Sequence, residues 1–97
     1  MLISRGATTM DNHLPERAVF ESIEVERTVD ASDLQCPLPL LKAKQGLNQL
    51  SSGQRLKVIA TDRGSVRDFH AFIELSQHTM VAFQETETHY YYILEKG

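Results

Sequence analysis

Short stretches in which apolar and polar residues alternate recur along the chain after its first fifth. A period of two is the pattern of a β-strand with one buried face. In the first stretch, Ile23, Val25 and Val29 alternate with polar residues, and Arg27 is the one imperfection. We expect four strands, over residues 22–30, 56–61, 80–85 and 90–95.

Two other stretches place apolar residues three and four positions apart, which is the spacing of a helix with one buried face. The first covers residues 37–50 and ends before Gly53, a residue suited to a left-handed helix cap. The second begins near Ser65, which has the spacing of a capping box with Asp68. The expected buried positions are Leu40, Ala43, Leu47 and Leu50 in the first helix and Val66, Phe69, Phe72 and Ile73 in the second.

The order of these elements is βαβαββ. A four-stranded mixed sheet with two helices on one face is the simplest arrangement that buries both helical stripes. We therefore predict a fold of the α/β (α+β) class, built as a two-layer sandwich.

The composition limits the chain to one such domain. It has 97 residues, of which 41% are hydrophobic and 24% charged, as in an ordinary globular protein. Residues 1–21 show no apolar period, so we expect a flexible N-terminal extension followed by a single domain over residues 22–97. No apolar run reaches the roughly 20 residues that cross a bilayer, and one cysteine cannot form an internal disulfide. We expect a cytoplasmic monomer.

The candidate chemistry lies at Cys36, the only cysteine, in a Cys-Pro-Leu-Pro sequence between the first strand and the first helix. Pro37 and Pro39 are tolerated there because N–H groups of a first helical turn have no intrahelical partner. The positive end of the helix dipole stabilises a sulfur anion, so we expect Cys36 to be a partly exposed, functional thiol. The N–H groups expected to face the anion are those of Leu38, Leu40 and Leu41.

Two blocks of sequence are similar to one known family. Residues 29–40 read Val-Asp-Ala-Ser-Asp-Leu-Gln-Cys-Pro-Leu-Pro-Leu, and residues 56–62 and 64–69 read Leu-Lys-Val-Ile-Ala-Thr-Asp and Gly-Ser-Val-Arg-Asp-Phe. The first block resembles the signature Leu-Asp-x-Arg-Gly-Leu-x-Cys-Pro-x-Pro of the TusA-like sulfur carriers, also called the SirA or YedF family. The second resembles the downstream block of the same family, and the resemblance covers about residues 25–97. It implies the βαβαββ fold already expected.

The resemblance also implies that Cys36 carries sulfur as a persulfide. The sulfur would come from a cysteine desulfurase or a rhodanese-type sulfurtransferase and pass to a thiol-bearing acceptor protein, for tRNA thiolation, molybdenum-cofactor maturation or sulfur oxidation. Such a protein is a carrier rather than a free-standing turnover enzyme, and no cofactor is expected. Because the chain has one cysteine, a partner's thiolate must remove the sulfur.

One departure from the family signature bears on the chemistry of the thiol. The Arg-Gly pair of the signature is replaced by Ser32-Asp33. Aspartate tolerates a left-handed backbone, so the loop shape can be kept, but its carboxylate is expected to raise the pKa of the thiol. Candidate partner-docking residues are Lys44, Asp62 and Arg67, for which a turn or a solvated surface is the alternative interpretation.

Two other functions stay open at this stage. One is a non-catalytic regulatory or interaction module with the same fold. The other is an RNA-binding domain, which the net charge of −3 disfavours. The rings of residues 90–92 would alternate between the two faces of a strand, which favours strand formation over base stacking. The histidines have no metal-ligand spacing, so no metal site is expected at His13, His70, His78 or His89.

Overall fold

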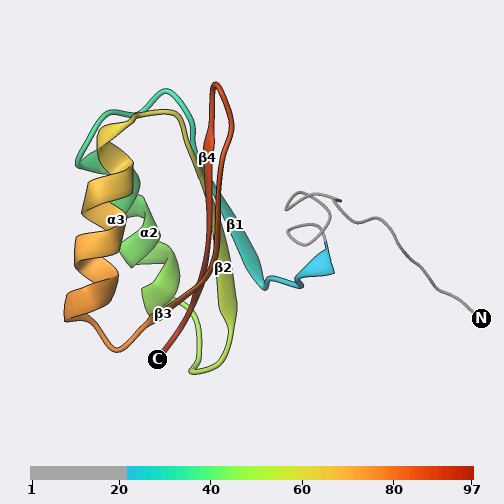
Figure 1. Cartoon of the computed structure of the whole chain (residues 1–97). Helices are drawn as coiled ribbons and strands as arrows, with labels where there is room; N and C mark the ends of the chain where they lie inside the picture. Colours follow the sequence, from blue (N-terminus) through green and yellow to red (C-terminus); the bar gives the residue numbers. More distant parts are fainter. Residues whose placement is uncertain (1–21) are drawn as a thin grey trace, which may run out of the picture.

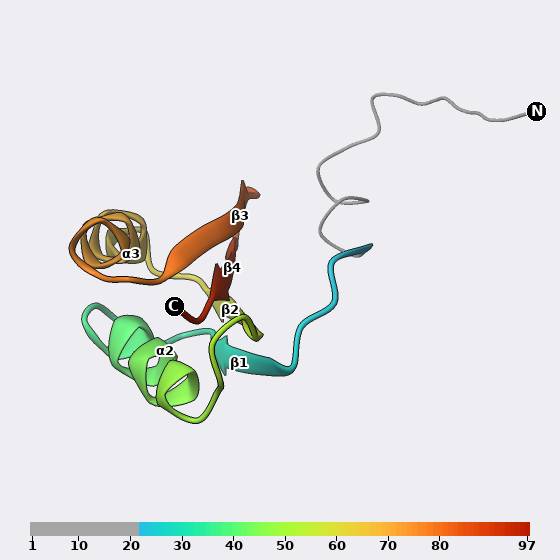
Figure 2. The ribbon, with the colours of Figure 1, turned by 90° about the horizontal axis from the view of Figure 1, so that it is seen from below.

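The computed structural model describes residues 22–97, in which a four-stranded sheet carries two helices on one face (Figures 1 and 2). The strands follow the spatial order β1-β2-β4-β3; β1 pairs with β2 in parallel, and the other pairs are antiparallel. This confirms the predicted mixed sheet and two-layer sandwich. The elements are β1 (Arg27–Ala31), α2 (Leu38–Asn48), β2 (Arg55–Ala60), α3 (Gly64–Leu75), β3 (Thr79–Glu85) and β4 (Tyr90–Glu95).

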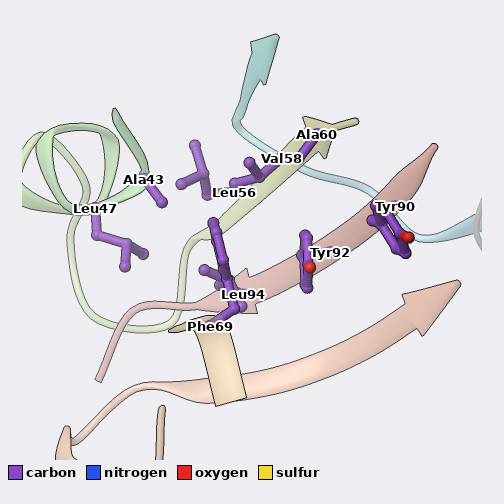
Figure 3. Packing of buried hydrophobic residues seen from close by; sticks show 9 residues of the cluster. All are labelled: Ala43, Leu47, Leu56, Val58, Ala60, Phe69, Tyr90, Tyr92 and Leu94. Carbon is purple, nitrogen blue, oxygen red and sulfur yellow. The ribbon is translucent and has the colours of Figure 1, made fainter. Parts of the chain in front are cut away.

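The core lies between the sheet and the helices, and Figure 3 shows its packing. Phe69 of α3 stacks on Tyr92 of β4 with ring centroids 4.2 Å apart, and both side chains are fully buried. All eight positions expected to face inward from the helices contribute to this core or pack against it. The other buried members of the cluster come from the sheet: Leu56, Val58, Ala60, Tyr90 and Leu94.

The last two strands were predicted closely, but the first strand was predicted too long. Pairing of β1 begins at Arg27, opposite Leu56, and β2 itself begins at Arg55. The Glu26 N–H donates to the Arg55 carbonyl, which is the last bond between the two segments in this direction. Residues before Glu26 lie beyond the start of β2 and cannot pair with it. The alternation of Ile23 and Val25 therefore predicts a strand that has no partner strand among residues 22–97.

The helix ends differ from the prediction in two ways. Helix α2 stops at Asn48, and Gly53 adopts its expected positive φ (90°) in the following turn rather than at the helix end. The capping box is wrong, because α3 begins one residue earlier and has no side-chain cap. Ser65 instead lies buried inside the helix, where its hydroxyl hydrogen-bonds that of Tyr92.

Two further expectations concern the N-terminal residues and membrane spans. The extension predicted for residues 1–21 lies outside the described residues. Within residues 22–97, no helix is both long and apolar enough to cross a membrane.

Candidate functional site

Cys36 lies in the loop between β1 and α2, two residues before the helix begins, and its side chain is exposed. The loop opens with a turn in which the Leu34 N–H donates to the Ala31 carbonyl at 3.3 Å. Asp33 follows the left-handed backbone expected of it, with φ 67°. Its N–H donates to Oγ1 of Thr61 at 2.8 Å, which ties this loop to the loop after β2.

The parallel pairing of β1 and β2 explains why these two loops meet. Ala31 and Ala60 end the two strands and are register partners, so both chains leave the sheet at the same edge. Figure 1 shows the two connections side by side at the upper end of the sheet, each leading into a helix. Residues that follow β2 are thereby brought to Cys36.

Asp62 of the second loop holds the backbone of Cys36, and Gly64, the first residue of α3, lies close to it. The Cys36 N–H donates to Oδ2 of Asp62 at 3.1 Å. A Cβ atom on Gly64 would lie 3.0 Å from that same oxygen, 3.4 Å from Cβ of Cys36 and 3.8 Å from its sulfur. Glycine is therefore the residue that lets helix α3 begin this close to the thiol.

The Cys36 thiol donates a hydrogen bond to Oδ2 of Asp68, on the second turn of α3. This bond is the largest cause that raises the pKa of the thiol above its ordinary value; desolvation and the charges of Asp68 and Asp62 add to it, whereas Arg67 opposes it. Neighbouring carboxylates thus raise the pKa of the Cys36 thiol. The carboxylates responsible are those of Asp68 and Asp62. An effect of Asp33 on the thiol stays a prediction.

The N–H groups at the start of α2 are less available than expected. The Leu38 N–H donates to the Gln35 carbonyl at 2.8 Å, and the Leu41 N–H donates to the Pro37 carbonyl at 3.1 Å. The expectation that both groups face an anion is therefore wrong, because the turn that carries Cys36 uses them itself. Pro37 precedes the helix as its cap residue and is exposed, whereas Pro39 lies in the first turn and is buried.

The candidate docking residues lie at different distances from the thiol. Asp62 touches Cys36 directly, as described above. Arg67 lines an open hollow at the start of α3, together with Arg63, Gly64 and His70. Gly64 also lies close to Cys36, so the hollow begins near the thiol. Lys44 is exposed on α2 and places its ammonium 5.2 Å from the centre of the Phe72 ring. Asp62 therefore contacts Cys36, and the charge of Arg67 acts on its thiol. Lys44 lies over Phe72 instead.

Two residues of the site were not recognised from the sequence. The sequence pattern assigns no site role to Gly64 and places Asp68 in a capping box. The signal that could have identified them is topological: in a parallel βαβ unit, the loop after the second strand and the first turns of its helix lie at the edge where the first loop lies. A polar side chain on that helix start can then reach Cys36.

The fold and the site define a small α+β protein that presents one exposed thiol at the edge of a mixed sheet. The family model described as sulfurtransferase TusA matches residues 27–96, and the chain belongs to this family. This confirms the resemblance found in the sequence and supports a role in carrying sulfur. A curated relative is the sulfur carrier protein TusA of Allochromatium vinosum, which is 44% identical over 74 residues, 76% of this chain and 97% of the relative.

Two solved structures also show similarity to the chain. One is an rRNA methylase from Streptococcus thermophilus, with a TM-score of 0.47 and 22% identity over 94% of this chain and 57% of that one. The other is a putative methyltransferase from Streptococcus mutans in complex with SAH, with a TM-score of 0.48 and 20% identity over 95% of this chain and 62% of that one. The chain spans less than two thirds of either solved protein.

Proposed function

We propose that this protein carries sulfur as a persulfide on Cys36, relaying it from a donor enzyme to an acceptor protein. The observation that supports the proposal is the exposed, single thiol at the sheet edge of a TusA family member. A cysteine desulfurase or a rhodanese-type sulfurtransferase is the donor, and a protein with a reactive thiol is the acceptor. The cytoplasmic setting expected from the sequence suits such a relay, because thiols stay reduced there.

Both transfer steps are exchanges at sulfur without net oxidation. The Cys36 thiol loses its proton and attacks the outer sulfur of the donor persulfide; the donor S–S bond breaks, and the donor cysteine leaves as a thiolate that takes up a proton. The acceptor thiolate then attacks the outer sulfur on Cys36, which leaves as a thiolate in turn. The chain has no second cysteine that could displace the sulfur as an internal disulfide.

The surroundings of Cys36 suit contact with a partner protein. Leu38 and Leu41 are nearly half exposed at the start of α2, two and five residues after Cys36. Arg67 and the hollow that it lines flank the other side, on α3. Arg67 and Asp62 are the docking residues nearest the sulfur, with Lys44 further along α2. A partner that covers this face meets apolar and charged groups together, as protein interfaces require.

The prolines of the motif support the presentation of the sulfur. Pro37 is exposed directly after Cys36, and its ring restricts the backbone there. Pro39 is fully buried in the first turn of α2 and fixes the helix start against the core. Pro37→Ala is expected to slow sulfur transfer more than it lowers stability, whereas Pro39→Ala is expected to lower stability by about 1–2 kcal/mol.

The proposal is tested by loading the purified protein. Incubation with a cysteine desulfurase and cysteine should add the mass of one sulfur atom to the wild type, measured as intact mass, and add none to Cys36→Ser. An equal gain in the serine variant would overturn the proposal. Acceptor proteins from tRNA thiolation, molybdenum-cofactor maturation and sulfur oxidation can then be compared as discharge partners, since alkylated Cys36 should block every productive route.

A further inference from the structure

Two carboxylates reach Cys36, and they bind different parts of it. Asp62 accepts from the backbone N–H at 3.1 Å. Asp68 accepts from the thiol itself. Asp62 lies in the loop after β2, and Asp68 lies on α3. Among residues 22–97, the charges that act on the sulfur are those of Asp68, Asp62 and Arg67.

The bond to Asp62 does not depend on the chemical state of the sulfur. A backbone N–H donates whether Cys36 is a thiol, a thiolate or a persulfide. The bond to Asp68 does depend on it, because an ionised carboxylate can only accept and the sulfur must supply the proton. A thiol supplies that proton, whereas an anionic persulfide has none to give.

Loading the carrier therefore removes a favourable contact and creates an unfavourable one. The thiol hydrogen bond to Asp68 is lost, and the negative sulfur comes to lie near a negative carboxylate. Arg67 offsets part of this repulsion, since its charge favours the anionic sulfur. The empty thiol is the state in which Cys36 makes both hydrogen bonds, from its N–H to Asp62 and from its thiol to Asp68.

We propose that Asp68 favours the empty, protonated state of Cys36 over the persulfide state, and so promotes release of the carried sulfur to the acceptor. Asp68 is a specific determinant of the loading equilibrium, distinct from residues that only hold the loop. This inference rests on the proposed function. It concerns how strongly the carrier retains its cargo, not whether sulfur is carried.

The exchange with glutathione persulfide isolates this equilibrium from partner docking. Its balance is Cys36–SH + GS–S⁻ ⇌ Cys36–S–S⁻ + GSH. The outer sulfur moves from glutathione to Cys36, one S–S bond breaks while another forms, and the Cys36 proton ends on the glutathione thiol. Asp68 shifts this equilibrium to the left for two reasons. It stabilises the Cys36 thiol by accepting its hydrogen bond, and it repels the anionic persulfide.

The experiment measures the loaded fraction of the full chain by intact mass at fixed ratios of glutathione persulfide to glutathione. Asp68→Asn removes the charge with little change in size, and we expect it to raise the loading equilibrium constant by about three- to tenfold. The midpoint of iodoacetamide alkylation against pH should fall in the same variant. Glu74→Gln is the matched control, because it removes an exposed carboxylate from the same helix and should change neither quantity.

Each outcome distinguishes the two proposals. Equal loading of wild type and Asp68→Asn would overturn the inference and leave the carrier function standing, even if the alkylation midpoint fell. Failure of both proteins to load, here and with the desulfurase, would overturn the carrier function and the inference with it. If Asp68→Asn does not fold, as judged by circular dichroism, Asp68→Ser supplies a second neutral residue, and Asp68→Glu should stay near wild type.

Discussion

The hydroxyl of Ser65 and the phenol of Tyr92 form a hydrogen bond of 2.8 Å that joins α3 to β4 inside the core. Ser65 is 1% exposed and Tyr92 is 0% exposed, so neither group has access to water when its partner is removed. Ser65 follows Gly64 directly. The bond therefore fixes the start of the helix that carries Asp68 to Cys36.

Removing one partner of this bond should cost more than removing both. Ser65→Ala leaves the Tyr92 hydroxyl buried without its partner, and we expect a loss of about 1–3 kcal/mol in the free energy of unfolding. Tyr92→Phe leaves the Ser65 hydroxyl without its partner, and we expect it to lower the free energy of unfolding by a similar amount or less. Urea unfolding of both single variants and the double variant checks this: a double variant as costly as the sum of the two would show that the bond carries no coupling energy.

Alkaline pH should destabilise the fold through Tyr92. Burial raises its pKa from 10.0 to about 12, with the hydrogen bond between Ser65 and Tyr92 acting in the opposite direction. Because the pKa is higher in the folded state, this contribution is fully present below pH 10 and is lost as the pH rises through about 12. Thermal unfolding between pH 9 and 12 should show a steeper decline for the wild type than for Tyr92→Phe, and parallel curves would contradict the assignment.

Glycine at position 64 should matter for the thiol, and glycine at position 53 for stability. Gly64→Ala places a methyl group 3.0 Å from Asp62 and 3.4 Å from Cβ of Cys36, so we expect a changed alkylation rate of Cys36. Gly53→Ala meets no atom within 4 Å but holds a φ of +90°, which should cost roughly 1–2 kcal/mol. The Gly53 variant should keep the wild-type alkylation rate. Identical alkylation in the Gly64 variant would show that the close approach does not position the thiol.

Asp33 remains a second candidate for tuning the thiol. Its backbone is left-handed, so Asp33→Gly keeps the loop shape and removes only the side chain. We expect this variant to lower the pH midpoint of Cys36 alkylation less than Asp68→Asn does, because Asp68 accepts a hydrogen bond from the sulfur directly. A larger fall for Asp33→Gly than for Asp68→Asn would reverse the order of importance drawn from the structure.

The layers of the fold could be predicted from the sequence because their signals are local. The helical stripe around Ala43 and the alternation through Val58 each fall within one element, and both proved to line the core. Ser65 and Asp68 show where local reasoning fails. Their spacing has the form of a helix cap, but Tyr92 and Cys36, distant in sequence, provide the partners that they actually bind. The side chains of Ser65 and Asp68 could have capped the helix, but distant residues bind the same polar atoms instead.

The parallel pairing of β1 with β2 sets when the site can form. The contacts of Cys36 with Asp62 and Asp68 span 26 and 32 residues, whereas β3 and β4 join through a short connection. Closing the longer loops costs more chain entropy, and contacts of this kind form slowly in folding. A chain that has folded only its β3–β4 hairpin thus carries an ordinary cysteine. The thiol acquires its native acidity only when the crossover through α2 has brought Asp62 and Asp68 to it, so alkylation of Cys36 during refolding reports on closure of the β1–α2–β2 unit.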